Sequence, residues 1–311
     1  MPHSPARPDL AALLAQLPAR PLTRFAPAPT GYLHLGHVVN AVYVWGLAGA
    51  IGGRVLLRVE DHDRLRCRPA FEAALLDDLD WLGLVPDLGR SPGGTVESAY
   101  RQSDNGPVYA GALSRLAERT AVYACDCSRR DIREASGDIV GEETPYSGRC
   151  RARGLGSGPG VGLRAVLGSG EEAFTDALLG PQRQEPARQC GDLLVQDRVG
   201  QWTYQFSVVV DDLHHGVDLV VRGEDLLASA GRQLRLAHLL GREAPPVFLH
   251  HPLARKPSGA KLSKSDGDTA VRELRAAGCT ASQLLGRAAC LAGLTDTERP
   301  LPARHLAALF A

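Results

Sequence analysis

Two histidines three positions apart, His34 and His37, follow a proline-bounded turn and precede a long apolar run. The first turn of a helix exposes unpaired N–H groups and a partial positive charge, so a helix that begins here would attract an anion. Residues i and i+3 lie on one helix face, and Gly36 admits a ligand close to the backbone. This spacing indicates phosphate binding. From this segment alone, two ordinary surface histidines remain the alternative, and no third ligand nearby completes a metal site.

A second candidate segment is the stretch "ARKPSGAKLSKSDGD" at 254–268, which carries Lys256, Lys261 and Lys264 among glycines and serines. Such composition is typical of a solvated loop. A mobile cationic loop can also close over a triphosphate and stabilise the charge that develops on departing pyrophosphate. We therefore interpret this segment, together with the histidine pair, as a candidate nucleotide-binding apparatus.

A third candidate is a set of cysteines in the middle of the chain. Cys125 and Cys127 form a Cys-x-Cys pair, and Cys150 follows in "PYSGRC". Three thiolates suit zinc, and Tyr146 is the nearest candidate for a fourth ligand. Single cysteines are often just small buried apolar residues. We interpret the other four in that way: Cys67, Cys190, Cys279 and Cys290.

Composition sets limits on the class of protein. The chain has 311 residues, with 35 Lys plus Arg and 35 Asp plus Glu, so any nucleic-acid contact must come from a local basic patch. No apolar stretch is long enough to span a bilayer, and the N-terminus does not resemble a signal peptide. Seven cysteines, an odd number, fit a reduced protein better than a disulfide framework. We expect a cytoplasmic enzyme without a membrane partner.

The elements that must position these residues follow from hydrophobic patterning. A short strand at 22–27 ends at prolines, and an apolar helix at 38–52 ends at two glycines. The run at 54–61 is typical of a strand buried on both faces, and 70–84 has helical spacing. This alternation predicts an α/β fold with a doubly wound, Rossmann-like parallel sheet.

The remaining chain continues the pattern after an interruption. We expect a helix at 109–121, a strand-rich segment at 188–212, a strand at 218–227, a helix at 228–241 and a strand that opens the basic loop at 248–268. The predicted organisation is a leader at 1–21, one half of the catalytic domain at 22–107, a zinc-bearing insertion at 108–200, the second half at 201–268 and a short helical segment at 269–311.

Five stretches in order carry a family resemblance: "RFAPAPTGYLHLGH", "LLRVEDHDR", "YQFSVVVDD", "VVRGEDLL" and "KLSKS". They resemble class I aminoacyl-tRNA synthetases of the glutamyl branch, over residues 22 to about 270. The resemblance implies activation of L-glutamate by ATP with Mg²⁺. It also implies that His34, His37, Lys261 and Lys264 act in catalysis and that Gly36 belongs to the ATP site. Positioning and electrostatics suffice for this displacement, so no nucleophilic side chain is needed.

The resemblance further implies a glutamate site made of Arg24, Phe25, Ala26, Pro27, Ala28, Glu60, Tyr204 and Arg222. Two arginines suit the two carboxylates of glutamate, an acidic residue suits its ammonium group, and the tyrosine would donate its hydroxyl. From the residues alone other interpretations stand. Glu60 could simply pair with Arg58 or Arg64, and Tyr204 could belong to the core.

The cysteine spacing is similar to that of a shortened branch of the glutamyl family, and only residues 266–311 follow "KLSKS". That branch implies one zinc ion on Cys125, Cys127, Tyr146 and Cys150, a monomer, no anticodon-binding domain, and transfer of glutamate to the queuosine base of tRNA(Asp). The alternatives are a truncated glutamyl-tRNA synthetase, a glutamate-activating ligase with another acceptor, and a non-catalytic homologue that binds tRNA or nucleotide.

Overall fold

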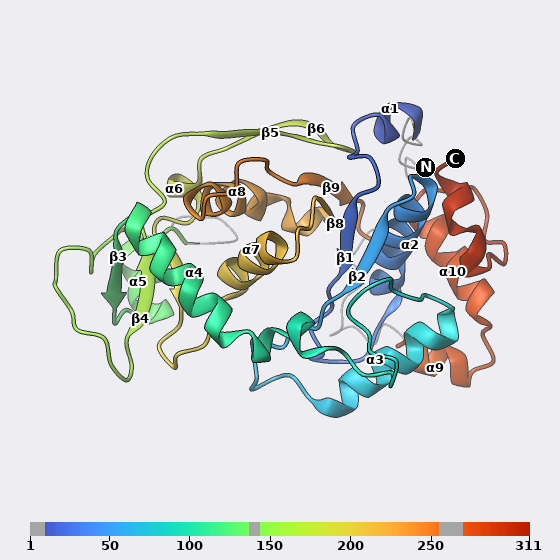
Figure 1. The fold of residues 1–311 in the computed structure, drawn as a ribbon, viewed down its shortest axis with the longest axis horizontal. Helices are drawn as coiled ribbons and strands as arrows, with labels where there is room; N and C mark the ends of the chain where they lie inside the picture. Colours follow the sequence, from blue (N-terminus) through green and yellow to red (C-terminus); the bar gives the residue numbers. More distant parts are fainter. Residues whose placement is uncertain (1–9, 137–143, 255–269) are drawn as a thin grey trace.

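The computed structural model describes residues 10–136, 144–254 and 270–311. A six-stranded sheet forms its centre (Figure 1). In spatial order its strands are β2 (Arg54–Leu57), β1 (Leu22–Phe25), β8 (Leu219–Gly223), β9 (Val247–His251), β5 (Glu172–Asp176) and β6 (Gly180–Gln184). The first five strands run parallel, and β6 is antiparallel to β5.

Helices cover both faces of this sheet. On one face lies α2 (Leu35–Ala50), and on the other lies α8 (Ala230–Leu239). Alternate residues of a strand point to opposite faces. Accordingly, Val221 of β8 belongs to the core that includes α2, whereas Val220 packs with Leu234 of α8. The predicted doubly wound α/β sheet is therefore confirmed.

The first predicted elements are all present, with shorter strands than expected. β1 occupies 22–25, and α2 begins three residues earlier than its predicted start at 38. β2 ends at Leu57, so the acidic end of the predicted strand continues as a loop. α3 (Pro69–Leu82) begins with proline and ends at Gly83, whose φ of 73° is a left-handed helix cap.

The C-terminal segment packs on the outer side of α2 (Figure 1). It consists of α9 (Val271–Ala276), α10 (Ala281–Leu291) and the 3₁₀ segment η5 (Ala303–Leu309). Gly46 of α2 permits this contact, because a Cβ there would lie 2.3 Å from the ring of Phe310. α2 is thus held between the sheet and the C-terminal helices, which explains why it is apolar almost all round.

A smaller antiparallel sheet lies at the opposite end of the molecule (Figure 1). Its strands are β3 (Val122–Cys125), β4 (Gly162–Ala165) and β7 (Leu193–Gln196), and the nearby helices are α4 (Gly106–Arg119), α5 (Arg129–Ser136) and α6 (Pro186–Gln189). The segment predicted as an insertion, 108–200, therefore contributes to both sheets, because β5 and β6 extend the large one.

One prediction of secondary structure is wrong. The segment 188–212 was expected to be strand-rich, but β7 is its only strand, and α7 (Tyr204–His214) occupies its second half. Valines and aromatic residues favour strands locally. Here Phe206, Val209 and Val210 lie at helical spacing and all enter one core cluster, so tertiary packing outweighs local propensity.

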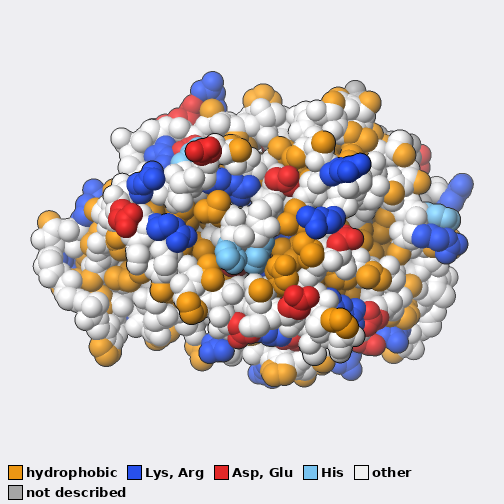
Figure 2. All heavy atoms as spheres, viewed as in Figure 1, with side chains coloured by type: hydrophobic (Ala, Val, Ile, Leu, Met, Phe, Trp, Pro, Cys, Tyr) orange, Lys and Arg blue, Asp and Glu red, His pale blue; other side chains and the backbone are white. Residues whose placement is uncertain are grey.

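The remaining elements are short: α1 (Leu10–Leu14), η1 (Ser98–Tyr100), η2 (Gln102–Asp104) and η3 (Glu224–Ser229). Within the described residues, no helix has the length and apolar character that crossing a membrane requires. Basic and acidic side chains are interspersed over the face seen in Figure 2. This distribution agrees with the balanced net charge of the sequence.

Candidate active site

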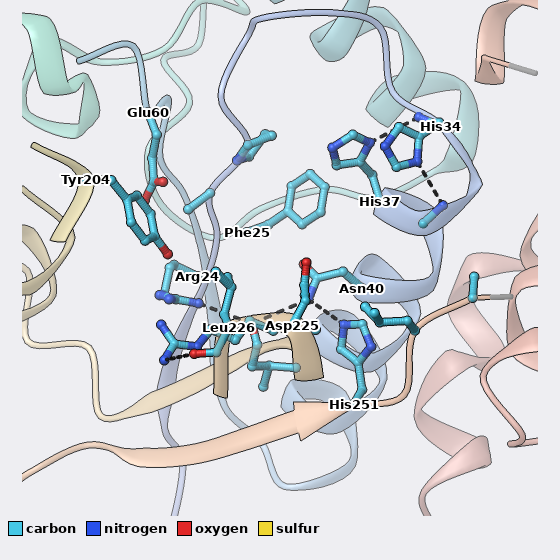
Figure 3. A pocket seen from close by; sticks show the side chains of 18 residues that line it. Arg24, Phe25, His34, His37, Asn40, Glu60, Tyr204, Asp225, Leu226 and His251 are labelled. Atoms are coloured by element: carbon cyan, nitrogen blue, oxygen red, sulfur yellow. Dashed lines mark hydrogen bonds between the residues drawn. The ribbon is translucent and has the colours of Figure 1, made fainter. Parts of the chain in front are cut away.

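A cavity of about 450 Å³ opens where the carboxyl ends of β1 and β8 meet the N-terminus of α2 (Figure 3). Clefts at this edge of a parallel sheet are the usual ligand sites of such folds. The lining residues are Arg24, Phe25, Ala26, Pro27, His34, Gly36, His37, Asn40, Glu60, Tyr204, Val221, Arg222, Gly223, Asp225, Leu226, His251, Leu253 and Ala254.

The two histidines stand side by side at the start of α2, with ring centroids 3.9 Å apart. Nδ1 of His34 accepts from the Gly36 N–H at 3.1 Å, and Nδ1 of His37 accepts from the His34 N–H at 3.1 Å. A ring nitrogen that accepts carries no proton, so each neutral ring has its N–H at Nε2. A Cβ on Gly36 would lie 3.0 Å from the His34 ring. Glycine therefore permits an arrangement in which both rings are N–H donors.

Asn40 and His251 are cavity residues that the sequence analysis did not single out. Nδ2 of Asn40 lies 3.1 Å from Nε2 of His251, and Nδ1 of His251 lies 2.9 Å from the Pro252 carbonyl oxygen. The His251 ring also stacks on Tyr43, with centroids 4.9 Å apart. The adjacent histidines of "FLHHPL" were the signal available in the sequence. The ring is held on three sides and adds a rigid wall to the cavity.

A buried ion network lies beneath the cavity. Arg58, which is fully buried, donates to Asp212 Oδ1 at 2.7 Å and to Glu60 Oε1 at 2.9 Å. Arg24 Nε lies 3.3 Å from Asp212 Oδ1. Burial acts to raise the pKa of Asp212, but three arginines, Arg24, Arg58 and Arg222, lower it below its usual value. Glu60 thus pairs with Arg58, as the alternative interpretation foresaw, and it also lines the cavity.

Asp211 lies beside this network, and its pKa shifts in the opposite direction to that of Asp212. Its carboxylate accepts hydrogen bonds from Gln102 Nε2 at 2.7 Å and from the Tyr109 hydroxyl at 2.9 Å. Arg58 Nε lies 3.7 Å away. Burial raises the pKa of Asp211 to about 6, although Arg58 and the two hydrogen bonds oppose the shift. Its titration therefore falls close to neutral pH.

Tyr204 lies on the wall opposite the histidines (Figure 3). Arg222 also lines the cavity. Tyr204 begins α7, and burial raises the pKa of its hydroxyl, so this group remains a donor at neutral pH. Arg222 projects from β8 and is buried. The alternative that Tyr204 is merely a core residue is incomplete, because it packs against one core cluster and also lines the cavity.

The predicted thiol cluster assembles at the small sheet. The Sγ atoms of Cys125, Cys127 and Cys150 all lie within 4.8 Å of one another. The Tyr146 oxygen lies 3.4 Å from Cys125 Sγ and 3.8 Å from Cys127 Sγ. Zinc–sulfur bonds of about 2.3 Å in a tetrahedron place sulfurs about 3.8 Å apart, and Cys127 and Cys150 are 3.5 Å apart. The donor set and its spacing fit a zinc ion.

The structure brings most of the predicted site residues together in one cavity. Those present are Arg24, Phe25, Ala26, Pro27, His34, Gly36, His37, Glu60, Tyr204 and Arg222. Ala28 is not among the lining residues. Lys256, Lys261 and Lys264 lie outside the described residues.

Comparison with known proteins gives consistent results. Residues 22–300 match the model of the catalytic domain of the class I tRNA synthetases (E and Q). The chain is 41% identical to the glutamyl-Q tRNA(Asp) synthetase of Symbiobacterium thermophilum, covering 92% of this chain and 91% of that protein. It is 40% identical to the protein of the same name from Rhodobacter capsulatus, covering 85% and 98%.

A solved structure shares the fold. The glutamate–tRNA synthetase of Elizabethkingia anophelis superposes with a TM-score of 0.76 at 25% identity, over 93% of this chain. The chain spans 65% of the length of that protein.

Proposed function

This chain belongs to the class I tRNA synthetases of the E and Q type, and on that premise we propose that it activates L-glutamate and transfers it to the queuosine base at the wobble position of tRNA(Asp). In the first step a carboxylate oxygen of glutamate attacks the α-phosphorus of ATP, and pyrophosphate leaves. In the second step a nucleophile of the base attacks the carbonyl carbon of the adenylate, and AMP leaves. We place this activity in the cytoplasm, in a monomer.

The observation that carries the proposal is the meeting of two chemically different walls in one cavity. Arg24 and Glu60 lie on one side, and the histidine pair lies on the other (Figure 3). Arg222 also lines the cavity. Two cations and one anion complement the two carboxylates and the ammonium group of glutamate. Paired N–H donors at a helix N-terminus complement phosphate. Bound in this cavity, the amino-acid carboxylate and the α-phosphate would be neighbours, as in-line attack requires.

The phosphate side is proposed to act by electrostatic stabilisation. The Nε2–H groups of His34 and His37 would donate to oxygens of the triphosphate as negative charge moves to pyrophosphate. We assign Lys261 and Lys264, from the segment outside the described residues, to the same charge. ATP would enter as its magnesium complex, since Mg²⁺ commonly binds through substrate phosphates.

We propose that Cys125, Cys127, Cys150 and Tyr146 hold one zinc ion. When bound, zinc would supply a cross-link between two separate segments of the small sheet region, the end of β3 and the loop that carries Tyr146 and Cys150, a structural and not a catalytic contribution. Burial acts to raise the pKa of the Cys150 thiol, but hydrogen bonds from Tyr146 and Cys127 lower it below its usual value. Burial and the hydrogen bond with Cys150 raise the pKa of the Cys127 thiol to about 11, so zinc binding would have to release the protons of the ligands.

A second cavity of about 660 Å³ supports an approach route for the tRNA. It lies between the small sheet and α7, and Tyr204 lines both cavities. Arg129 and Arg133 line the second cavity. Guanidinium groups bind the nucleic-acid backbone, so the acceptor would reach the adenylate from this side.

The first test is ATP–pyrophosphate exchange with glutamate, glutamine and aspartate in the absence of tRNA, followed by transfer of labelled glutamate to tRNA(Asp) with and without queuosine. We expect exchange with glutamate alone and labelling of queuosine-containing tRNA only. Labelling of a tRNA 3′ end would favour the glutamate–tRNA synthetase activity named for the structural neighbour. Absence of exchange with zinc and Mg²⁺ present would contradict adenylate formation.

A further inference from the structure

Arg222 is held by neutral acceptors. Its Nε donates to His250 Nε2 at 2.9 Å, Nη1 donates to Gln233 Oε1 at 2.7 Å, and Nη2 donates to the Leu226 carbonyl oxygen at 3.3 Å. Arg24 differs, because it forms a direct ion pair with Asp212. In the part of the chain that the structure describes, no carboxylate lies within ion-pair distance of Arg222. Its charge is therefore not directly neutralised before a ligand arrives.

A chain of hydrogen bonds links Arg222 to an acid through an imidazole. His250 is the direct partner of Arg222 in the pairing of β8 with β9, and its side chain is fully buried. His250 Nδ1 lies 2.6 Å from Asp176 Oδ2, on the next strand, β5. Asp176 is also fully buried, and its Oδ1 accepts from the backbone N–H groups of Leu178 at 3.0 Å and Leu179 at 2.9 Å.

These contacts determine the protonation of His250. Arg222 Nε is a donor only, so His250 Nε2 must accept, and the ring proton lies on Nδ1, facing Asp176. If both ring nitrogens of His250 carried a proton, the Nε2–H group would face the Nε–H group of Arg222, and two donors would oppose each other. Burial lowers the pKa of His250, which favours the neutral ring, although the hydrogen bond to Asp176 opposes this shift.

We propose that His250 and Asp176 are positioning residues that orient Arg222 toward a carboxylate of the amino-acid substrate; this inference rests on the proposed function. Asp176 selects the tautomer of His250, and His250 then fixes the Nε end of the guanidinium. Arg222 lines the cavity, whereas neither His250 nor Asp176 does. The side-chain freedom of the arginine is thereby lost on folding and not on binding, which favours affinity.

The geometry also explains why an imidazole is suitable here. A carboxylate in direct contact with Arg222 would orient the guanidinium but would also neutralise it. A neutral ring of the same reach orients it and leaves its charge for the ligand. The ring of Phe248, whose centroid lies 5.0 Å from Arg222 Cζ, contributes a further contact that does not neutralise the charge.

The test compares His250→Phe, which removes the acceptor, with His250→Gln, which supplies an amide oxygen. His305→Phe, at an exposed position in η5, is the matched control. We expect His250→Phe to raise KM for glutamate about 10-fold or more, with KM for ATP changed less than 2-fold. His250→Gln should recover part of the loss, and the control should behave as wild type.

A double-mutant cycle separates positioning from general damage to the fold. If His250 acts through Arg222, then His250→Phe should have little additional effect in an Arg222→Met background. Additive losses, or equal rises in KM for both substrates, would overturn the inference. Calorimetric titration with L-glutamate alone, and thermal melting of each variant, accompany the kinetics.

The controls also separate this inference from the proposed function. Failure of wild type to catalyse exchange contradicts the proposed function, whereas wild-type exchange with an unaltered glutamate KM in folded His250→Phe contradicts only the positioning role. If wild type binds no glutamate in the titration, both are contradicted.

Discussion

Nη1 of Arg58 lies 2.7 Å from Oδ1 of Asp212, and both side chains are buried below the proposed glutamate site. Burial acts to lower the pKa of Arg58, but three neighbouring acids, Asp212, Glu60 and Asp211, raise it well above its usual value. The guanidinium thus balances the negative charge of Glu60, in the loop after β2, and of Asp211, in α7. It joins the loop after β2 to α7 by charge.

Replacement of Arg58 by methionine should strongly destabilise the protein, because it leaves buried carboxylates without their cation. The free energy of unfolding in denaturant should fall by about 3–5 kcal/mol. Arg130→Met provides the control, since Arg130 forms an exposed pair with Glu134 on α5, and such pairs contribute little. Equal effects of the two substitutions would contradict the role assigned to Arg58.

Asp211 should make stability fall as pH rises from about 4 to 6. The pKa of Asp211 is about 6 in the folded protein, against an ordinary value of 3.8, so the folded state binds the proton more tightly in this window. Below the pKa that Asp211 has in the unfolded protein, the bound proton stabilises the folded state fully. This stabilisation is lost as the pH rises through the pKa that Asp211 has in the folded protein. The unfolding free energy of wild type minus that of Asp211→Asn should decrease by up to about 3 kcal/mol across the window. A flat difference would contradict the raised pKa.

Loss of either cavity histidine should slow adenylate formation more than it weakens glutamate binding. Removing one donor that stabilises developing charge typically lowers kcat about 10²- to 10³-fold. We expect His34→Ala and His37→Ala to show such losses in ATP–pyrophosphate exchange, with KM for glutamate little changed. His214→Ala, at an exposed position ending α7, is the control. If the substitutions raised the KM for glutamate and left kcat unchanged, the histidines would act on glutamate and not on ATP.

The thiol cluster should hold one zinc ion per chain, measured by elemental analysis of purified protein. Cys125→Ser and Cys150→Ser should release the metal and lower the melting temperature. Tyr146→Phe should weaken retention against a chelator if the phenol oxygen is the fourth ligand. Cys279→Ser, outside the cluster, should retain metal as wild type does. Full retention by Tyr146→Phe would indicate that another group completes the site.

Local sequence was sufficient to predict the elements that nearby prolines and glycines delimit. Prolines end β1, glycine ends α3, and the long apolar run between them became the central helix α2. The histidine pair was placed at a helix start because its spacing and its glycine are local features. The Cys-x-Cys pair likewise predicted a thiol cluster that the structure assembles.

Contacts between distant segments were not accessible in the same way. α7 was expected to be strand, because valine-rich composition favours strands until a core is available to pack against. The pairing of β5 with β9 joins Asp176 to His250, 74 positions apart, and nothing in either neighbourhood indicates the other.

The sequence by itself determined the alternation of strands and helices, the candidate phosphate-binding histidines and the candidate metal ligands, because short-range spacing controls each of them. Only the tertiary structure decided that Glu60 pairs with Arg58 while lining the cavity, and that Arg222 is oriented by His250 and Asp176. Such choices depend on burial and on which charges meet across strands. Those are properties of the folded sheet and not of any one segment.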